Sequence, residues 1–404
     1  MGDKKKVPKI RFPEFTDEWE PCKLGDETIE ILAGGDIDKD KVVKNGKYPI
    51  YANTLVNDGI VGYYDDYYRV KAPAVSVTGR GEVGHAQARM TDFTPVVRLL
   101  AIRSDHDCYF LENAINTQRI IIESTGVPQL TVPQLSSYDI FFPKKLEEEQ
   151  KIGEYFHSID NLINLHKHKL DHLKLLKKSM LQKMFPRNGA KQPEVRFPGF
   201  TDDWEQRKFD YVFNFAIPNN TLSRAELNYE YGSVKNIHYG DILIKYGAIV
   251  DVKKDYIPFV TGKTSKELKA TLLQDGDIVI ADTAEDETTG KACEICNSQG
   301  VEVVAGLHTI AYRPGIKMAL GYLGYYLNSN AYHYQLLPLM QGIKVLSLSR
   351  TNIQKTNVSY PKDSDEQELI AGYFRNLDNL IALYQRKVEH LTLFKKGMLQ
   401  KMFV

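Results

Sequence analysis

Two glycine-containing segments have the spacing of nucleotide-binding motifs. Gly79-Arg-Gly-Glu-Val-Gly84 matches the glycine pattern of dinucleotide-binding folds, where the last glycines open a helix whose N-terminus holds a pyrophosphate. Here the next clear apolar run, after Pro95, is typical of another strand, so we expect a turn that glycine permits. Gly262-Lys-Thr264 ends like a phosphate-binding loop, but Ile257 stands where that loop needs its first glycine. We therefore expect an exposed polar turn there.

Cys293 and Cys296 form one Cys-x-x-Cys pair, whereas a structural zinc site usually needs four ligands. Cys22, Cys108 and His308 could complete such a site only through the fold, and we predict no metal site. Four unevenly spaced cysteines do not form a disulfide framework in a chain of this length, which favours a reducing compartment.

Acidic clusters occur at residues 147–149 and 282–287 and could in principle hold the metal ions of a nuclease. The first cluster falls in the opening turn of a predicted helix, where carboxylates favour the helix dipole, and the second is typical of a solvated loop. The sequence contains no Asn-Pro-Pro-Tyr or Asp-Pro-Pro-Tyr segment of the kind that amino-methyltransferases use. We predict no catalytic residue in this chain.

The composition indicates a globular protein with more than one core. The chain has 404 residues, and single cores stop growing near about 250 to 300 residues. The 52 basic and 52 acidic side chains give no net positive field, so a nucleic-acid surface would have to be local or shared with a partner. No apolar run reaches the length of a membrane span, and no secretory signal follows Met1, so we expect a cytoplasmic protein.

The sequence repeats itself at two places. The thirteen residues Pro8–Glu20 recur 185 positions later as Pro193–Glu205, with nine identities that include the only two tryptophans, Trp19 and Trp204. A longer repeat aligns residues 147–185 with residues 365–403 at an offset of 218 positions, and 21 of its 39 positions are identical. The segments between these markers differ from each other.

Both copies of the long repeat predict helices of about 58 Å, because apolar residues recur at steps of three and four without an internal proline. A mean spacing of 3.5 residues is that of a coiled-coil seam, and the simplest partner of each stripe is the other stripe, although core packing elsewhere would also bury it. The predicted pairing residues are Phe156, Ile159, Ile163, Leu170 and Leu173 in the first copy and Phe374, Leu377, Ile381, Val388 and Leu391 in the second.

The two middle segments, about 21–142 and 206–360, predict mixed domains with much β structure. Helices are expected near residues 110–123 and 318–334. Strands are expected at the runs Ala74–Thr78, Val96–Arg103, Asp241–Lys245 and Asp277–Ala281.

Two variable domains alternating with two similar long helices resemble the specificity subunits of type I restriction-modification systems. The resemblance covers nearly the whole chain. It is carried by the Arg-Phe-Pro-x-Phe-Thr-Asp-x-Trp-Glu opening of each half, by a proline four residues before each acidic helix start (Pro143 and Pro361), and by the Met-Leu-Gln-Lys-Met-Phe end of each helix.

The resemblance implies an α+β fold in which two mixed α/β target-recognition domains alternate with two long helices that pair as an antiparallel coiled coil, with a pseudo-twofold internal repeat. The implied bounds are 1–146 and 187–362 for the recognition domains and 147–186 and 363–404 for the repeated spacer helices. Each recognition domain would read one half of a bipartite double-stranded DNA target, and the helices would fix the separation of the halves.

In this family the chemistry resides in other chains: two methylation subunits that use S-adenosylmethionine, and restriction subunits that use ATP and Mg²⁺. The resemblance therefore implies a non-catalytic chain without a cofactor of its own, whose helices dock the two methylation subunits. Loop placement and charge suggest DNA contacts from Arg80 and His85 in the first domain and from Lys263, Lys344 and Arg350 in the second.

Two other interpretations compete with this one. A nucleotide-dependent oxidoreductase or hydrolase would use the glycine segments, and binding of a dinucleotide or ATP by the isolated chain would identify it. A scaffold without DNA contact would use the helices to join two identical partners. Loss of all sequence preference after the middle of one half is exchanged would refute the scaffold interpretation.

Overall fold

The computed structural model describes residues 7–118, 128–187 and 189–404. The chain divides into two units, and each contains the beginning of one long helix and the end of the other. Unit 1 comprises Met1–His168 and Tyr384–Val404, and unit 2 comprises Lys169–Leu383. The long helices are α3, Leu146–Lys183, and α9, Ser364–Met402, which agrees with the two helices that the repeat predicts.

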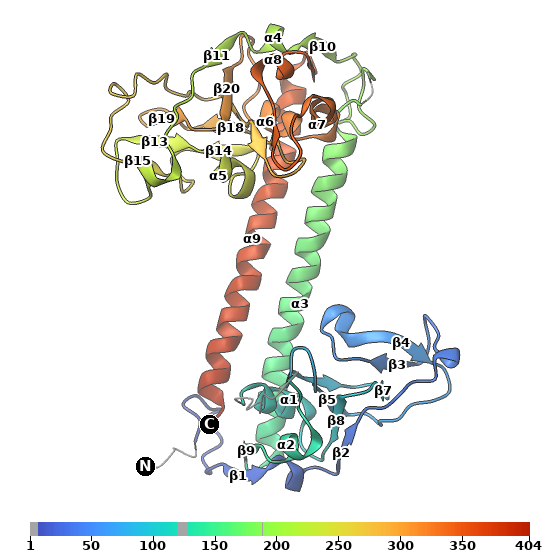
Figure 1. Cartoon of the computed structure of the whole chain (residues 1–404). Helices are drawn as coiled ribbons and strands as arrows, with labels where there is room; N and C mark the ends of the chain where they lie inside the picture. The colour runs from blue at the N-terminus through green and yellow to red at the C-terminus, as the bar shows by residue number, and fades with distance from the viewer. Residues whose placement is uncertain (1–6, 119–127, 188) are drawn as a thin grey trace. The chain divides into compact units, whose positions relative to one another are not determined.

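Unit 1 is built on an antiparallel sheet of order β2-β8-β5-β6 (Figure 1). A smaller sheet has the order β4-β3-β7, and β1 pairs with β9. The strands are β1 Glu20–Lys23, β2 Glu30–Ala33, β3 Tyr48–Tyr51, β4 Ile60–Tyr64, β5 Ala74–Thr78, β6 Ala86–Arg89, β7 Thr94–Pro95, β8 Leu99–Arg103 and β9 Asp139–Phe142.

Helix α1, Cys108–Asn116, packs against β5 and β6, and α2, Val132–Ser136, lies against β2. Phe110, Leu111, Ala114 and Ile115 of α1 are buried in one core with Trp19 and with the beginning of α3. Three 3₁₀ turns complete the unit: η1 Leu24–Glu27, η2 Lys39–Lys41 and η3 Val56–Gly59.

Unit 2 has a five-stranded sheet of order β11-β20-β16-β18-β14 and a four-stranded sheet of order β12-β15-β13-β19. Strand β10 pairs with β22, and β17 pairs with β21. The strands are β10 Glu205–Lys208, β11 Phe215–Ile217, β12 Leu227–Asn228, β13 Val234–Ile237, β14 Ile249–Asp251, β15 Phe259–Val260, β16 Ile278–Ala281, β17 Thr283–Ala284, β18 Ala292–Cys296, β19 Glu302–Ala305, β20 Thr309–Arg313, β21 Leu346–Ser347 and β22 Asn357–Tyr360.

Unit 2 also contains several short helices (Figure 1). They are α4 Phe209–Val212, α5 Tyr239–Ile244, α6 Tyr322–Leu327, α7 Asn330–Leu336 and α8 Arg350–Ile353, with the 3₁₀ turns η4 Arg224–Glu226 and η5 Leu337–Leu339. The apolar strands β16 and β18 are buried over their whole length and form the centre of the core. Within the described ranges, no helix is long and apolar enough to cross a membrane.

The strand predictions were right at β5 and at β16 and wrong at the run Asp241–Lys245, which forms α5. A short apolar run fits a strand or a helix equally well, and here side-chain contacts decide. The ring of His238 accepts a hydrogen bond from Gly240 at the helix start, and Asp241 is held by Arg224 and by Lys245 one turn later. Helical geometry makes the contact with Lys245 possible.

Three other predicted elements differ in their bounds. Arg98 has a left-handed φ of 73°, so β8 begins after it and not at Val96. The helix predicted over 318–334 is interrupted between α6 and α7, where the hydroxyl of Ser329 donates to the carbonyl of Tyr326 at 2.6 Å. The helix predicted over 110–123 corresponds to α1 and ends by Asn116; residues 119–123 of that prediction lie outside the described residues.

Candidate functional site

The first short repeat of the sequence binds the opening turn of α3. Arg11 forms two parallel hydrogen bonds to Glu148, from Nε to Oε1 at 2.6 Å and from Nη2 to Oε2 at 2.7 Å. The indole N–H of Trp19 donates to the same Oε1 atom at 3.3 Å. Glu148 is 1% exposed, so its charge is paired in a place that solvent does not reach.

Unit 2 contains the same arrangement in the second copy of the repeat. Arg196 binds Glu366 through Nε at 2.7 Å and through Nη2 at 2.8 Å, and Trp204 donates to Glu366 at 3.2 Å. Glu148 lies in the opening turn of α3, as expected, and the structure adds that its carboxylate is buried and paired with Arg11 and Trp19. Glutamate stands at the same position in both copies of the long repeat, as Glu148 and Glu366, and this identity was the sequence signal for its role.

The Met-Phe end of each helix packs beside the beginning of the other helix. In unit 1 the ring of Phe403 lies 6.2 Å from that of Trp19, 5.3 Å from Phe110 and 5.9 Å from Phe156. In unit 2 the ring of Phe185 lies 6.3 Å from that of Trp204 and 5.8 Å from Phe374. These rings lie at corresponding repeat positions, so the duplicated residues make the same contacts in each unit.

An ion pair between corresponding residues joins the two helices within each unit. In unit 1 the ammonium of Lys395 lies 2.7 Å from both carboxylate oxygens of Asp160. In unit 2 the corresponding residues Lys177 and Asp378 form the same pair, and the hydroxyl of Tyr325 also donates to Asp378 at 2.8 Å.

Of the predicted pairing residues, seven are buried and three, Ile381, Val388 and Leu391, are half-buried. Leu391 packs against the core of unit 1 together with Met398 and Leu399. The C-terminal part of the α9 stripe thus contacts the core of unit 1.

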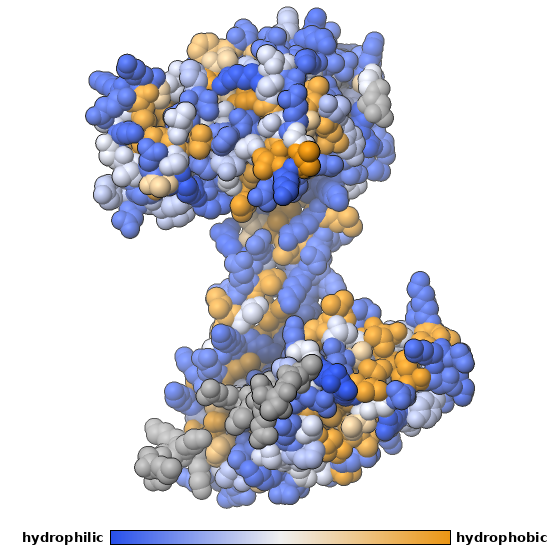
Figure 2. Space-filling view, in the orientation of Figure 1, coloured by the Kyte–Doolittle hydropathy of each residue, from blue (hydrophilic) through white to orange (hydrophobic). Residues whose placement is uncertain are grey.

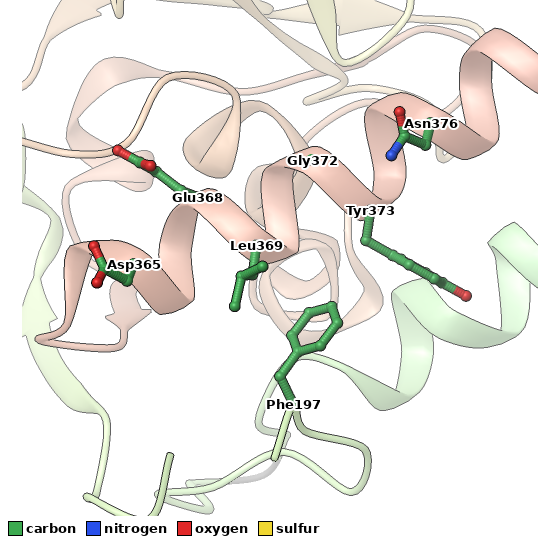
Figure 3. Close-up of a pocket in the computed structure, with 7 residues that line it drawn as sticks. All are labelled: Phe197, Asp365, Glu368, Leu369, Gly372, Tyr373 and Asn376. Atoms are coloured by element: carbon green, nitrogen blue, oxygen red, sulfur yellow. The ribbon is translucent and has the colours of Figure 1, made fainter. Parts of the chain in front are cut away.

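A groove of about 620 Å³ runs along α9 in unit 2 (Figure 3). The rings of Phe197 and Tyr373 lie 6.2 Å apart at one side of it, and Leu369 and Gly372 leave its floor apolar and open. Asp365 and Glu368 lie toward the start of the helix (Figure 3).

The corresponding surface of unit 1 keeps the aromatic pair but not the open floor. Phe12 and Tyr155 lie 6.3 Å apart. Lys151 occupies the position of Leu369, forms an ion pair with Glu14 and lies over the ring of Phe15 at 5.5 Å. The two helix faces therefore share their aromatic residues and differ in charge.

Arg80 and His85 lie on one tight turn between β5 and β6. Gly81 and Gly84 have left-handed φ values of 72° and 82°, and the amide of Gly84 closes the turn on the carbonyl of Thr78 at 2.7 Å. The segment is the glycine turn that we expected, although β6 follows it directly. His85 lies at the surface of this turn, and desolvation of its ring by neighbouring residues lowers its pKa, so His85 is neutral near pH 7.

The three candidates of unit 2 lie in different settings. Lys263 is in an exposed turn after β15, where Gly262 has a φ of 66°, and its ammonium lies 3.6 Å from Glu226. Lys344 is exposed at the tip of the loop that leads into β21. Arg350 begins α8 and donates to the carbonyl of Ile217 at 2.9 Å, so part of its guanidinium already supports the fold.

The cysteine pair is part of the core. Cys293 and Cys296 lie on the buried strand β18, and burial raises the pKa of Cys293 to about 12 and that of Cys296 to about 11. Both thiols are therefore protonated at neutral pH. No group of three or more His, Cys, Asp or Glu residues placed to hold a metal ion occurs in the part of the chain that the structure describes.

Comparison with known proteins gives a consistent result. The family model "Type I restriction modification DNA specificity domain" matches residues 16–175 and again residues 201–393. The chain is 22% identical over 423 residues to the type I restriction enzyme MjaVIII specificity subunit of Methanocaldococcus jannaschii, which covers 97% of this chain and 93% of that protein.

A shorter match is 28% identical over 145 residues to a protein of Mycoplasma pneumoniae that is described as a type I specificity subunit. It covers 34% of this chain and only 39% of that relative's length. The crystal structure of the S subunit of a type I restriction-modification system from M. genitalium has a similar fold, with a TM-score of 0.60 at 16% identity over 98% of this chain and 99% of that chain.

Proposed function

Since this chain belongs to the family of type I restriction-modification specificity subunits and carries the family's DNA specificity domain twice, we propose that it selects the DNA sequence on which such a complex acts. Each β-rich domain reads one half of a bipartite double-stranded DNA target. The observation that supports this most directly is the duplicated Arg-Trp-Glu contact, which fastens each recognition domain to the first turn of its own long helix.

The two long helices pair as an antiparallel coiled coil that sets the distance between the half-sites. The ion pairs Lys395–Asp160 and Lys177–Asp378 support this proposal, because each joins the C-terminal part of one helix to the N-terminal part of the other. The same contacts recur in both units, which suits two half-sites and two copies of a partner.

The outer faces of the helices dock two methylation subunits. The groove beside Phe197 and Tyr373 supports this role in unit 2, because it leaves aromatic and apolar side chains uncovered on α9. In this proposal the chain is not an enzyme and works in the cytoplasm. The methylation subunits bind S-adenosylmethionine, and restriction subunits bind ATP and Mg²⁺.

Methylation mapping tests the proposal. The chain is produced with its cognate methylation subunit in a bacterial host that lacks adenine methylation, and the genome is sequenced by a single-molecule method that detects methyladenine. We expect a split, asymmetric methylated motif that appears only when this chain is present. A stable complex that produces no motif would support the scaffold interpretation instead.

A further inference from the structure

We propose that Arg80 reads a guanine in the first DNA half-site and that Asn53 is the residue that positions it. The inference rests on the proposed function. Its geometric basis is a pair of loops in unit 1 that partly buried side-chain hydrogen bonds hold in place.

The side chain of Asn53 links its own segment by hydrogen bonds to the turn at Gly79 and Arg80 and to the segment at Val97. Its Oδ1 atom accepts hydrogen bonds from the amides of Gly79 at 2.8 Å and Arg80 at 3.3 Å, and its Nδ2 atom donates to the carbonyl of Val97 at 3.0 Å. The fit at Gly79 is close, since a Cβ atom there would lie 2.1 Å from the carbonyl oxygen of Arg98. The main chain at Arg80 therefore has one position relative to the sheet.

The side chain of Arg80 is half-buried, and its Nε–H is buried without a hydrogen-bond partner among the described residues. A buried donor without a partner costs free energy, so the Arg80 side chain gains when it turns outward to an acceptor that a ligand supplies. His85, on the same turn, has a lowered pKa and is neutral near pH 7. Of these two candidates, Arg80 is thus the one that brings a positive charge to the turn.

The neighbouring loop, η3, is held in an unusual conformation. Asn57 and Asp58 are consecutive non-glycine residues with left-handed φ values of 52° and 57°. Such residues cost conformational free energy and persist where the surrounding structure imposes them. Strain of this kind occurs at functional loops, which motivates a role for η3 in recognition.

Arg89 binds this loop through Asp58. Its side chain is 7% exposed and donates from Nη1 to the Asp58 carboxylate at 2.8 Å and from Nη2 to the Asp58 carbonyl at 3.1 Å. The guanidinium also lies over the ring of Tyr51 at 3.7 Å and donates to Ser76 at 2.9 Å. The guanidinium of Arg89 is buried and paired within unit 1. We therefore assign Arg89 a supporting role and not a contact with DNA.

Two apolar side chains are exposed where η3 begins. Val56 is 78% exposed and Leu55 is 40% exposed. Figure 2 shows apolar surface gathered over the β3–β4 region of unit 1. A surface that combines exposed apolar side chains with the Arg80 guanidinium, which has no hydrogen-bond partner among the described residues, suits the edge of a base pair in the major groove. There guanine offers the N7 and O6 acceptors and thymine offers a methyl group.

The test uses the complete complex with its methylation subunit, after methylation mapping has identified the half-sites. Binding is measured by competition among duplexes that vary one position of the first half-site at a time. We expect Arg80→Ala to weaken binding to the cognate duplex by about tenfold or more and to remove the preference for guanine at one position only. Replacing that guanine by 7-deazaguanine, which lacks N7, should weaken binding of the wild type and leave Arg80→Ala unaffected.

Asn53→Ala should relax the preference at the same position, and the double variant should be no weaker than Arg80→Ala alone, because both changes remove one contact. Asn53→Asp keeps the acceptor for the two amides and should retain part of the preference. Lys344→Ala, in the other unit, is the matched control and should leave the first half-site unchanged.

Three results would overturn the inference: a first half-site that contains no guanine, an Arg80→Ala complex that keeps its base preference, or equal weakening on every sequence, which would indicate a phosphate contact. If Asn53→Ala fails to fold, the Arg80 and 7-deazaguanine measurements still decide the matter. Failure of the proposed function itself looks different, since the wild-type complex would then show no sequence preference at either half-site.

Discussion

Trp204 donates its indole N–H to Glu366 at 3.2 Å across 162 positions of sequence, and Arg196 holds the same carboxylate. The contact joins the short repeat at residues 193–205 to α9, the helix that follows the β domain of unit 2. It explains why tryptophan, arginine and glutamate recur together in both halves, because each needs the other two when buried.

Removing the carboxylate should destabilise unit 2. We expect Glu366→Ala to lower the free energy of unfolding by about 3 kcal/mol, since it leaves the buried guanidinium of Arg196 without its partner. Urea unfolding followed by tryptophan fluorescence measures the change. The neighbouring Asp365 is exposed, and Asp365→Ala should change stability by less than about 0.5 kcal/mol. Equal effects of the two substitutions would contradict this role of Glu366.

The ion pair between Asp160 and Lys395 should contribute to helix pairing in unit 1. A double-mutant cycle with alanine at both positions should give a coupling energy of about 1 kcal/mol, because the pair is partly buried and both carboxylate oxygens accept. The more exposed pair Glu14–Lys151 is the matched control, and its coupling should be smaller. A coupling near zero for Asp160 and Lys395 would mean that the helices do not depend on this contact.

Unit 1 should lose stability as pH rises above the usual range of histidine. His106 lies 2.8 Å from Glu149 and 3.1 Å from Glu27. Burial lowers the pKa of His106, but these hydrogen bonds outweigh burial and raise it above 6.5. Protonation is thus favoured in the folded state, so the stabilisation is complete below the unfolded pKa and disappears as pH rises through the folded pKa.

Thermal unfolding of the wild type and His106→Gln between pH 5.5 and pH 8.5 measures this effect. The difference in stability between them should be largest at the acidic end of the range and shrink toward the alkaline end. Unit 2 offers an internal comparison, because Gln367 takes the position of Glu149 and bonds to the Ala319 amide and the Pro361 carbonyl without any histidine. A difference that does not vary with pH would contradict the prediction.

The length of the helices should set the spacing of the DNA target. Insertion of seven residues after His168 and, at the corresponding position, after Arg386 adds about 10 Å to each helix and keeps the heptad phase. We expect both half-sites to stay the same and the spacer to grow by about three base pairs. Methylation mapping gives the result. An unchanged number of base pairs between the half-sites would show that helix length does not set the spacing.

Lys344→Ala should weaken recognition of the second half-site only. The side chain is exposed on the loop before β21 and has no ion-pair partner among the described residues, so its removal should not affect folding. Competition binding with duplexes altered in either half-site measures the change, and Arg80→Ala provides the reciprocal variant. If both half-sites keep their affinity, Lys344 does not contact DNA.

The sequence alone predicted the elements that depend on local pattern and on repetition. An apolar stripe at helical spacing over 39 positions lies on one face only in an α-helix. The observed helices α3 and α9 match the repeated segments to within two residues at each end. The turn at Gly79–Gly84 was also predictable, because glycines at this spacing permit the left-handed conformations that Gly81 and Gly84 adopt.

Only the tertiary structure decided the rest, because these outcomes depend on contacts between residues far apart in the chain. Glu148 is typical of a solvated first-turn acid until Arg11 and Trp19, more than 100 positions away, are placed around it. The run Asp241–Lys245 is apolar enough for a strand, and distant Arg224 helps to make it a helix. Asn53 has no pattern at all in the sequence, and its position became visible only when the fold brought it against Gly79, Arg80 and Val97.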